Sequence, residues 1–446
     1  MRNFIKNVTI TGSARFLQLI IGIIISIIIA RSLGPKNKGI YALAIMLPTL
    51  IITLFNLGIG KAITYYLSKK IYCKSVILFN NIFLSIITGF FGMCIGIITI
   101  IFFRQNILPN VPEGYLFFTL ILIPLGFINT NIQYYYLGLN KIKAYNIIPT
   151  IYSFLSLILL LILVKVLKLG ITGCISGSIL SLSIALVISL YYANKITGRI
   201  SYTIDSNFCK KVLKYGIQIQ MGGIVAFLNY RIDMFLINII LGPAQVGFYT
   251  ISVGMVEQLS IVSDTVSALL FPKIAGEKDI QRKNNITPII TRNMFWIVSF
   301  VAIALFFLCR WIILILYSEL YIPSVRPLQA LLIGTIAISI SSILWQDIAA
   351  RGHVMLNNYI DLIVLAINII LNLLWIPKYG ISGAAWASTF SYTFSLLCRL
   401  YFYCELSNNL WKKVIFPQRD DWILYKKLFK NISKFNKSKA DNTFDY

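Results

Sequence analysis

Charged residues are scarce in this chain of 446 residues, and their scarcity excludes an ordinary soluble protein. Only 12% of the residues are charged and 58% are hydrophobic, whereas about a quarter of the residues in soluble domains are charged. Acidic residues are the fewest, because 15 Asp and Glu stand against 40 Lys and Arg, for a formal net charge of +25. A basic excess can indicate nucleic-acid binding. Here the positive charge lies in alternate loops between apolar segments, which is typical of membrane topology instead.

Residues and motifs of catalysis are almost missing as well. The one histidine, His353, is predicted in a short loop beside Arg351, where we expect neither a base nor a ligand. There is no H-E-x-x-H metal motif, no G-x-x-x-x-G-K-[ST] phosphate loop and no G-x-S-x-G turn. The seven cysteines show no metal-site or redox spacing. We therefore expect no enzyme, no ATP motor, no cofactor and no structural disulfide.

Long apolar segments are abundant. A helix needs about 20 apolar residues to cross a bilayer, and the first segment lacks the cleavage site of a signal peptide. Twelve segments are predicted to span, at 12–33, 40–67, 75–103, 115–138, 146–166, 171–193, 216–241, 246–270, 292–317, 325–349, 359–377 and 379–402.

The distribution of cations predicts the orientation of these segments. With the N-terminus in the cytoplasm, 30 Lys and Arg fall inside and 9 outside, while Arg231 lies within a span. This asymmetry places both termini in the cytoplasm. The basic tail is either an arm on the anionic inner leaflet or a solvated segment with only a topological role. The sequence leaves both open.

The chain also repeats itself over a long distance. The stretch Leu33-Gly34-Pro35 … Gly39-Ile40-Tyr41 returns 208 residues later as Leu241-Gly242-Pro243 … Gly247-Phe248-Tyr249. A second pair, Gly170-Ile171-Thr172-Gly173 and Gly380-Ile381-Ser382-Gly383, has an offset of 210. Two matches at almost one offset predict an all-α membrane protein of two parallel six-helix repeats, an arrangement that many carriers use for alternating access. The predicted parts are an N-terminal lobe at 1–193, a cytoplasmic linker at 194–215, a C-terminal lobe at 216–402 and a basic cytoplasmic tail at 403–446.

Polar residues recur at helical spacing within several spans, which places each set on one face. An ionisable group at the bilayer centre costs at least about 2.5–3.5 kcal/mol, so it needs a partner or a wet cavity. Packing is the alternative for the small and hydroxyl residues, and snorkelling to the interface is the alternative for Arg15 and Lys61. Arg231 and Asp233 cannot both face one cavity, so we expect one of them to pair with a neighbour such as Glu257. The candidate substrate-binding residues are Arg15, Gln18, Asn56, Lys61, Asn229 and Arg231, and the candidate ion-coupling residues are Asp233, Glu257 and Asp264.

Four of these stretches, in order along nearly the whole chain, resemble signatures of bacterial polysaccharide flippases of the Wzx kind. They are Gly12-Ser13-Ala14-Arg15 with Ala30-Arg31-Ser32-Leu33-Gly34-Pro35, Asn229-Tyr230-Arg231-Ile232-Asp233 with the second Leu-Gly-Pro, Leu270-Phe271-Pro272-Lys273-Ile274-Ala275, and Gly380-Ile381-Ser382-Gly383-Ala384-Ala385. Two features depart from the family: no proline follows Gly216, and Lys61 is a cation where such sequences often have a small residue.

This resemblance implies the multidrug/oligosaccharidyl-lipid/polysaccharide (MOP) exporter fold, which is MATE-like, in a bacterial inner membrane. It implies transfer of an undecaprenyl-diphosphate-linked oligosaccharide from the inner to the outer leaflet for cell-surface polysaccharide such as O-antigen. Membrane lipids, a polysaccharide polymerase and chain-length machinery would be partners of a monomeric protein that binds no nucleic acid. Arginine suits such a cargo because its fork binds phosphate in a bidentate way. Coupling to H⁺ or Na⁺ is left open.

Three other classes compete with this hypothesis. A small-molecule drug or cation antiporter of the same superfamily would favour an acidic cavity, against which Arg15, Lys61 and Arg231 argue. A lipid II flippase usually has two further spans. A membrane polymerase or acyltransferase often has a large outer loop or a catalytic histidine, and its halves are not expected to repeat.

Overall fold

The computed structural model describes residues 2–198, 201–277, 279–416 and 418, and these residues are helical throughout apart from their connections. Of the predicted tail, residue 417 and residues 419–446 lie outside the described residues, as do residues 199–200 of the predicted linker. The helices, including two π-helices (η1, η2) and one 3-10 helix (η3), are α1 (Arg2–Phe55), α2 (Ile59–Ser68), α3 (Lys74–Ile98), η1 (Thr99–Phe103), α4 (Arg104–Ile107), α5 (Glu113–Thr119), α6 (Leu122–Gly138), α7 (Ile142–Leu160), η2 (Leu161–Val166), α8 (Gly170–Thr197), α9 (Ser206–Leu241), α10 (Pro243–Gly276), α11 (Ile280–Leu316), η3 (Glu319–Ser324), α12 (Val325–Ala350), α13 (Val354–Ser407) and α14 (Trp411–Ile415).

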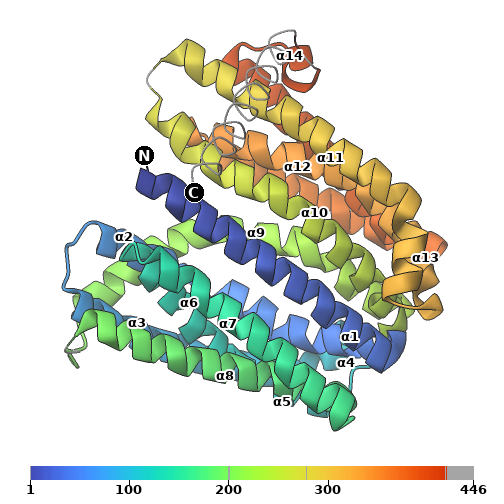
Figure 1. Cartoon of the computed structure of the whole chain (residues 1–446), viewed down its shortest axis with the longest axis horizontal. Helices are drawn as coiled ribbons and strands as arrows, with labels where there is room; N and C mark the ends of the chain where they lie inside the picture. Colours follow the sequence, from blue (N-terminus) through green and yellow to red (C-terminus); the bar gives the residue numbers. More distant parts are fainter. Residues whose placement is uncertain (1, 199–200, 278, 417, 419–446) are drawn as a thin grey trace, which may run out of the picture. The chain divides into compact units, whose positions relative to one another are not determined.

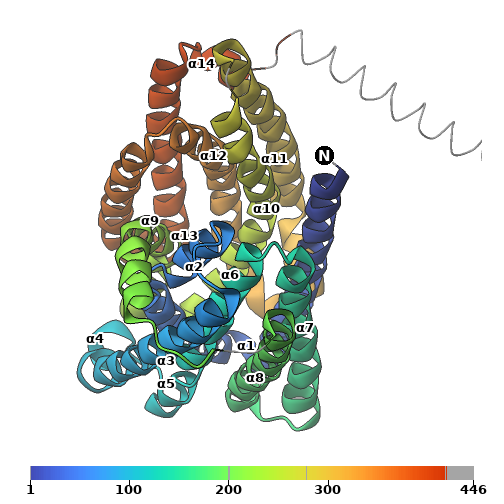
Figure 2. The same ribbon diagram turned by 90° about the vertical axis from the view of Figure 1, so that its left-hand side faces the viewer.

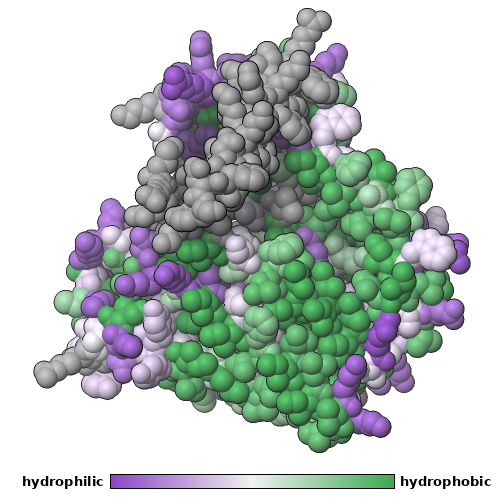
Figure 3. Space-filling view, in the orientation of Figure 1, coloured by the Kyte–Doolittle hydropathy of each residue, from purple (hydrophilic) through white to green (hydrophobic). Residues whose placement is uncertain are grey.

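The helices expose the apolar surface that a membrane protein needs. Ten helical segments among the described residues are long and apolar enough to cross a bilayer. Large apolar side chains on them are exposed, such as Phe90, Val187 and Phe300 at 65%, 66% and 76%. Figure 3 shows a broad hydrophobic area over the region of α1, α7 and α8. Because lipid replaces water around such a surface, the chain is a multi-pass membrane protein.

Two of the ten segments are each interrupted by a glycine, and each of these glycines has a repeat partner elsewhere in the chain. In α1 Gly34 has φ 70°, and in α13 Gly380 has φ 62°. Their partners at offsets of 208 and 210, Gly242 and Gly170, have φ 86° and 57°. Only glycine adopts such a backbone at little cost. Proline follows Gly34 and Gly242 directly, and its fixed φ suits the first turn of a new helix.

Contacts divide the chain into two units. The first unit comprises Met1–Gln258, Phe306–Leu332 and Asp361–Ser391, and the second comprises Leu259–Leu305, Ile333–Ile360 and the described residues from Tyr392 onward. Within the first unit, α6 packs against α2, α3 and α8, while α7 packs against α1 and α8 (Figures 1 and 2).

The first unit also holds a contact between the two copies of the repeated motif. A Cβ atom built on Gly39 would lie 1.7 Å from the carbonyl oxygen of Pro243, and one built on Gly247 would lie 1.9 Å from that of Pro35. The two backbones therefore touch, and each copy supplies the glycine that the other copy requires. The arrangement is reciprocal, as expected for two related halves.

Buried polar side chains join the helices of the second unit. The carboxylate of Asp347 accepts hydrogen bonds from Thr287 and Arg351, and Arg351 also donates to Asn284 over 2.9 Å. Arg399 is 3% exposed and donates to Ser341 and Ser395 over 2.6 Å each. Each of these buried charges thus has a partner or hydrogen bonds, as burial demands.

One of the predicted spans differs from the structure. The span expected at 40–67 is not one helix, because α1 ends at Phe55 and α2 begins at Ile59 after a turn in which Gly58 has φ 64°. A Cβ on Gly58 would lie 2.1 Å from the carbonyl oxygen of Gly216, so this turn lets two backbones approach closely. The predicted linker at 194–215 is mostly helical, since α8 runs to Thr197 and α9 begins at Ser206 with its N-terminus capped by Asp205.

Candidate functional site

A cavity of about 250 Å³ lies among three helices of the first unit. On each helix the lining residues recur at steps of three and four, which places them on one face. Helix α1 contributes Ala42, Ile45, Met46 and Thr49, helix α9 contributes Phe227, Arg231 and Met234, and helix α10 contributes Thr250, Val253, Gly254 and Glu257.

An ion pair lies in the wall of this cavity. The Arg231 guanidinium is 2.8 Å from the Glu257 carboxylate, and both side chains remain partly exposed, at 29% and 38%. Among the described lining residues these two alone are ionisable. We expected one of Arg231 and Asp233 to pair with a neighbour such as Glu257, and Arg231 is the residue that does so. The cavity wall is apolar apart from this pair and the hydroxyls of Thr49 and Thr250.

The repeat relates the α1 face to the α10 face. An offset of 208 converts Ala42, Ile45, Met46 and Thr49 into Thr250, Val253, Gly254 and Glu257. The same offset converts Ile23 into Arg231. The cavity is thus built from equivalent faces of two copies, while both charges come from the second copy.

Asp233 lies away from this cavity. It is 4% exposed, and its carboxylate accepts a hydrogen bond from the Tyr249 hydroxyl over 2.6 Å and from the backbone N–H of Met234 over 2.8 Å. Side chains two positions apart on an α-helix point about 200° apart around its axis. Arg231 therefore faces the cavity and Asp233 does not. Sequence reasoning missed Tyr249, although it is the tyrosine of the repeated motif. The equivalent Tyr41 bonds Ser178 over 3.2 Å.

Two further candidates are held by neighbouring helices of the first unit. The Asn229 side-chain nitrogen donates to the backbone carbonyl of Asp361 over 3.0 Å, while its oxygen is buried without a partner among the described residues. Gln18 donates to Thr150 over 3.0 Å, across the contact between α1 and α7. In this structure Gln18 therefore takes part in helix packing.

The remaining candidates are spread along the chain. Arg15 and Lys61 are exposed, on α1 and α2 respectively. Asn56 lies in the turn between α1 and α2, where the left-handed Gly58 separates the two helices. Asp264 is exposed and belongs to the second unit.

A buried lysine that the sequence did not single out lies near the contact between the repeated motifs. Lys38 is 6% exposed; its ammonium is 3.4 Å from the Ser26 hydroxyl and lies over the rings of Tyr317 and Tyr321, at 5.1 and 5.7 Å from their centres. The Tyr321 hydroxyl donates to the carbonyl of Ala30 over 2.9 Å. These contacts join α1 to Tyr317, which lies between α11 and η3, and to Tyr321 within η3.

The fold defines the class of the chain, which is an all-helical multi-pass membrane protein. The structure superposes on a lipid II flippase, MurJ, in an inward closed conformation, with a TM-score of 0.71 and 19% identity over 88% of this chain and 87% of that one. It also superposes on an inward-facing multidrug resistance MATE family transporter of the MOP superfamily, with a TM-score of 0.73 and 14% identity over 90% and 98%. At these identities the likeness shows the fold alone.

The sequence comparison is more specific. A family model described as polysaccharide biosynthesis protein matches residues 4–276, and the chain belongs to this family. It is 24% identical to a putative O-antigen transporter of Shigella flexneri, over 80% of this chain and 87% of that protein. It is also 24% identical to the capsular polysaccharide biosynthesis protein CapF of Staphylococcus aureus, over 90% and 99%.

Proposed function

We propose that this protein is a flippase that moves an undecaprenyl-diphosphate-linked oligosaccharide from the inner to the outer leaflet of a bacterial inner membrane. Three observations support this: membership of a polysaccharide biosynthesis family, a fold like that of a lipid II flippase, and an arginine in a cavity between repeated helices. The arginine is the observation on which the proposal chiefly rests. A hydrated headgroup needs polar partners to cross hydrocarbon.

The proposed architecture has twelve spans in two parallel six-helix repeats. The ten candidate segments become twelve when Ile10–Phe55 and Val354–Ser407 are each divided at their left-handed glycine. Both termini face the cytoplasm, as the cation asymmetry predicts. The lobes are 1–193 and 216–402, joined through 194–215. In this orientation the contact between Gly39 and Gly247 lies at the outer end, and alternating access requires it to open.

The proposed mechanism is a competition for Arg231. In the structure its guanidinium is occupied by Glu257, so a diphosphate has to displace that carboxylate. Neutralising Glu257 with H⁺ or Na⁺ frees the guanidinium, whose planar fork then binds phosphate oxygens. This links cargo binding to ion binding at one residue pair. Pockets for drug-sized ligands measure about 300–1,000 Å³, so a cavity of about 250 Å³ suits the diphosphate rather than a whole glycan.

The other candidates take supporting roles in this proposal. Asn229 offers to a sugar hydroxyl a side-chain oxygen that has no partner among the described residues. Arg15 and Lys61, which are exposed near the proposed cytoplasmic end, attract the anionic headgroup before it enters. Asp233 and Asp264 are the alternative sites for a coupling ion.

The test compares neutral variants of the ion pair in a bacterium that needs this protein for its surface polysaccharide. Arg231→Gln is expected to abolish the polysaccharide while the protein stays in the membrane. Glu257→Gln is expected to make export less sensitive to the external pH. The double variant Arg231→Gln/Glu257→Gln leaves no unpaired charge. If the ion pair has only a structural role, the double variant therefore recovers export, whereas a site for phosphate stays lost.

Wild-type polysaccharide in the double variant would therefore refute the role of Arg231. The competing function is a small-molecule antiporter, which the likeness to a MATE transporter favours. Drug resistance conferred on an efflux-deficient host, without any effect on surface polysaccharide, would establish that alternative.

A further inference from the structure

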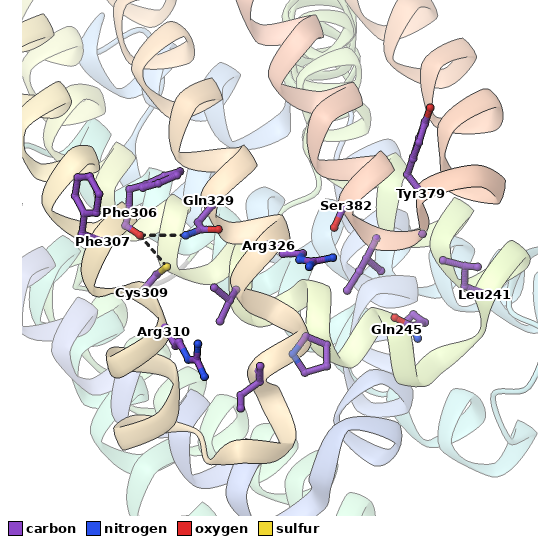
Figure 4. A pocket seen from close by; sticks show the side chains of 15 residues that line it. Leu241, Gln245, Phe306, Phe307, Cys309, Arg310, Arg326, Gln329, Tyr379 and Ser382 are labelled. Atoms are coloured by element: carbon purple, nitrogen blue, oxygen red, sulfur yellow. Dashed lines mark hydrogen bonds between the residues drawn. The ribbon is translucent and has the colours of Figure 1, made fainter.

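A second and larger pocket, of about 850 Å³, lies in the first unit at the ends of several helices. It is separate from the cavity at Arg231, and the two share no lining residue. Its walls come from the ends of α9 and α11, from η3, from the starts of α10 and α12, and from the turn at Gly380 in α13 (Figure 4). Its volume falls within the range of about 300–1,000 Å³ for ligand pockets.

Two arginines line this pocket without an acidic partner. Arg310 and Arg326 are exposed, and the lining residues include no Asp or Glu. Neither guanidinium forms an ion pair or hydrogen bond with the described residues, whereas Arg104 pairs with Glu113 at 3.0 Å and Arg31 donates to the carbonyl of Leu316 over 2.8 Å. Figure 4 shows Arg326 in the middle of the lining side chains and Arg310 on the neighbouring helix. Both forks are therefore available to an anion.

Polar and aromatic groups complete the wall. Gln245 and Ser382 line the pocket, and the Gln329 side-chain nitrogen is held by the carbonyl of Phe306 over 3.3 Å, which fixes the side chain (Figure 4). Two aromatic side chains at the wall are largely exposed, Phe307 at 73% and Tyr379 at 65%. Tyrosine is enriched in membrane proteins at the level of the lipid headgroups, as expected of Tyr379 here.

These features select one class of ligand. Unpaired guanidinium groups select phosphate, because the fork matches two phosphate oxygens. Exposed aromatic rings beside them provide an apolar surface for a chain attached to that phosphate. A soluble anion would use only the first feature, whereas a lipid uses both.

We propose that this pocket binds the phosphate headgroup of an anionic membrane lipid between Arg310 and Arg326, with the lipid chain against Phe307 and Tyr379. In the orientation proposed above, the site lies at the outer leaflet. The binding itself does not depend on the flippase function, and it would hold equally for another cargo.

The experiment measures the melting temperature of the purified full chain in detergent with increasing phosphatidylglycerol. Wild-type protein is expected to be stabilised in a saturable way. The variant Arg310→Gln/Arg326→Gln is expected to need at least about tenfold more lipid, because it loses charge-assisted hydrogen bonds. The single variant Arg326→Lys keeps the charge without the fork and is expected to fall between the two.

The matched control removes two cations from the corresponding turn of the first half. Lys165 and Lys168 are exposed and precede Gly170, the repeat partner of Gly380. Lys165→Gln/Lys168→Gln is expected to respond to phosphatidylglycerol as the wild type does. Phosphatidylcholine and inorganic pyrophosphate are the ligand controls. An unchanged response of the arginine variant, or stabilisation by pyrophosphate equal to that by the lipid, would overturn the proposal.

Discussion

The contact between the repeated motifs can be tested with one methyl group. In Gly247→Ala the new Cβ would lie 1.9 Å from the carbonyl oxygen of Pro35. Carbon and carbonyl oxygen approach to about 3.3 Å at the closest, so the two backbones must separate by about 1.4 Å. Both atoms are fixed to the backbone, and no rotamer relieves the clash. Such overpacking costs about 1–3 kcal/mol.

That cost falls on the closed arrangement alone. If the protein alternates between closed and open outer ends, a penalty of about 1–3 kcal/mol lowers the ratio of closed to open protein by about 5- to 150-fold. The assay uses Ala30→Cys, a residue 1% exposed whose carbonyl accepts from Tyr321. In a background whose seven native cysteines are replaced by serine, a membrane-impermeant maleimide added outside is expected to label Cys at position 30 at least about fivefold faster in Gly247→Ala.

Gly22→Ala is the matched control, because a Cβ there would meet nothing within 4 Å and the residue lies in the same helix as Ala30. Gly39→Ala is expected to act like Gly247→Ala, and the double variant is expected to add less than the sum since both methyl groups press on one crossing. Labelling of Gly247→Ala at the rate of Gly22→Ala would show that the contact is not part of a gate.

Two further expectations concern buried groups of the first unit. Tyr249→Phe leaves the buried Asp233 carboxylate with one hydrogen bond fewer and is expected to lower the free energy of unfolding by about 1.5–3 kcal/mol. The repeat-equivalent Tyr41→Phe loses a hydrogen bond between two neutral hydroxyls and is expected to lower it by about 0.5–1.5 kcal/mol. Equal melting temperatures of the two variants would contradict this expectation. Burial, together with the nearby Asp205, raises the pKa of the Cys209 thiol, while Cys73 is exposed. Since the thiolate is the reactive form, the alkylation rate of Cys209 is expected to be lower than that of Cys73 at neutral pH and to keep rising at alkaline pH. Mass spectrometry measures both rates, and comparable rates near pH 7 would disprove the effect.

Much of the fold was predictable because membrane helices follow simple rules. Apolar length locates the spans, and the matched glycines indicate positions where the backbone leaves the helix. Four glycines at the ends of long apolar runs have a positive φ, namely Gly34, Gly170, Gly242 and Gly380. The helical break at Asn56 was not predictable, because it depends on Gly58 meeting Gly216, a contact between residues far apart in the chain.

The site was predictable only in part. Helical spacing was enough to expect that one of Arg231 and Asp233 pairs with a neighbour, since a charge in a span needs a partner. Spacing could not identify Tyr249 as the donor to Asp233, or Lys38 as a buried cation over two tyrosines, because these partners come from other helices. Spacing along α1 also could not show that Gln18 donates to Thr150 on α7, because that partner again lies on another helix.

The repeat explains why the chemistry of the cavity is asymmetric while its scaffold is not. Equivalent faces of α1 and α10 place Thr49 and Glu257 at matched positions, and Ile23 is the counterpart of Arg231. Duplication thus supplies two walls with the same geometry, and substitutions in one copy add the charges. Glycine must be kept in both copies where the motifs touch, because each glycine makes room for the other copy's backbone. The charged residues Arg231 and Glu257 face no such reciprocal constraint, because they lie away from the contact between the two motifs.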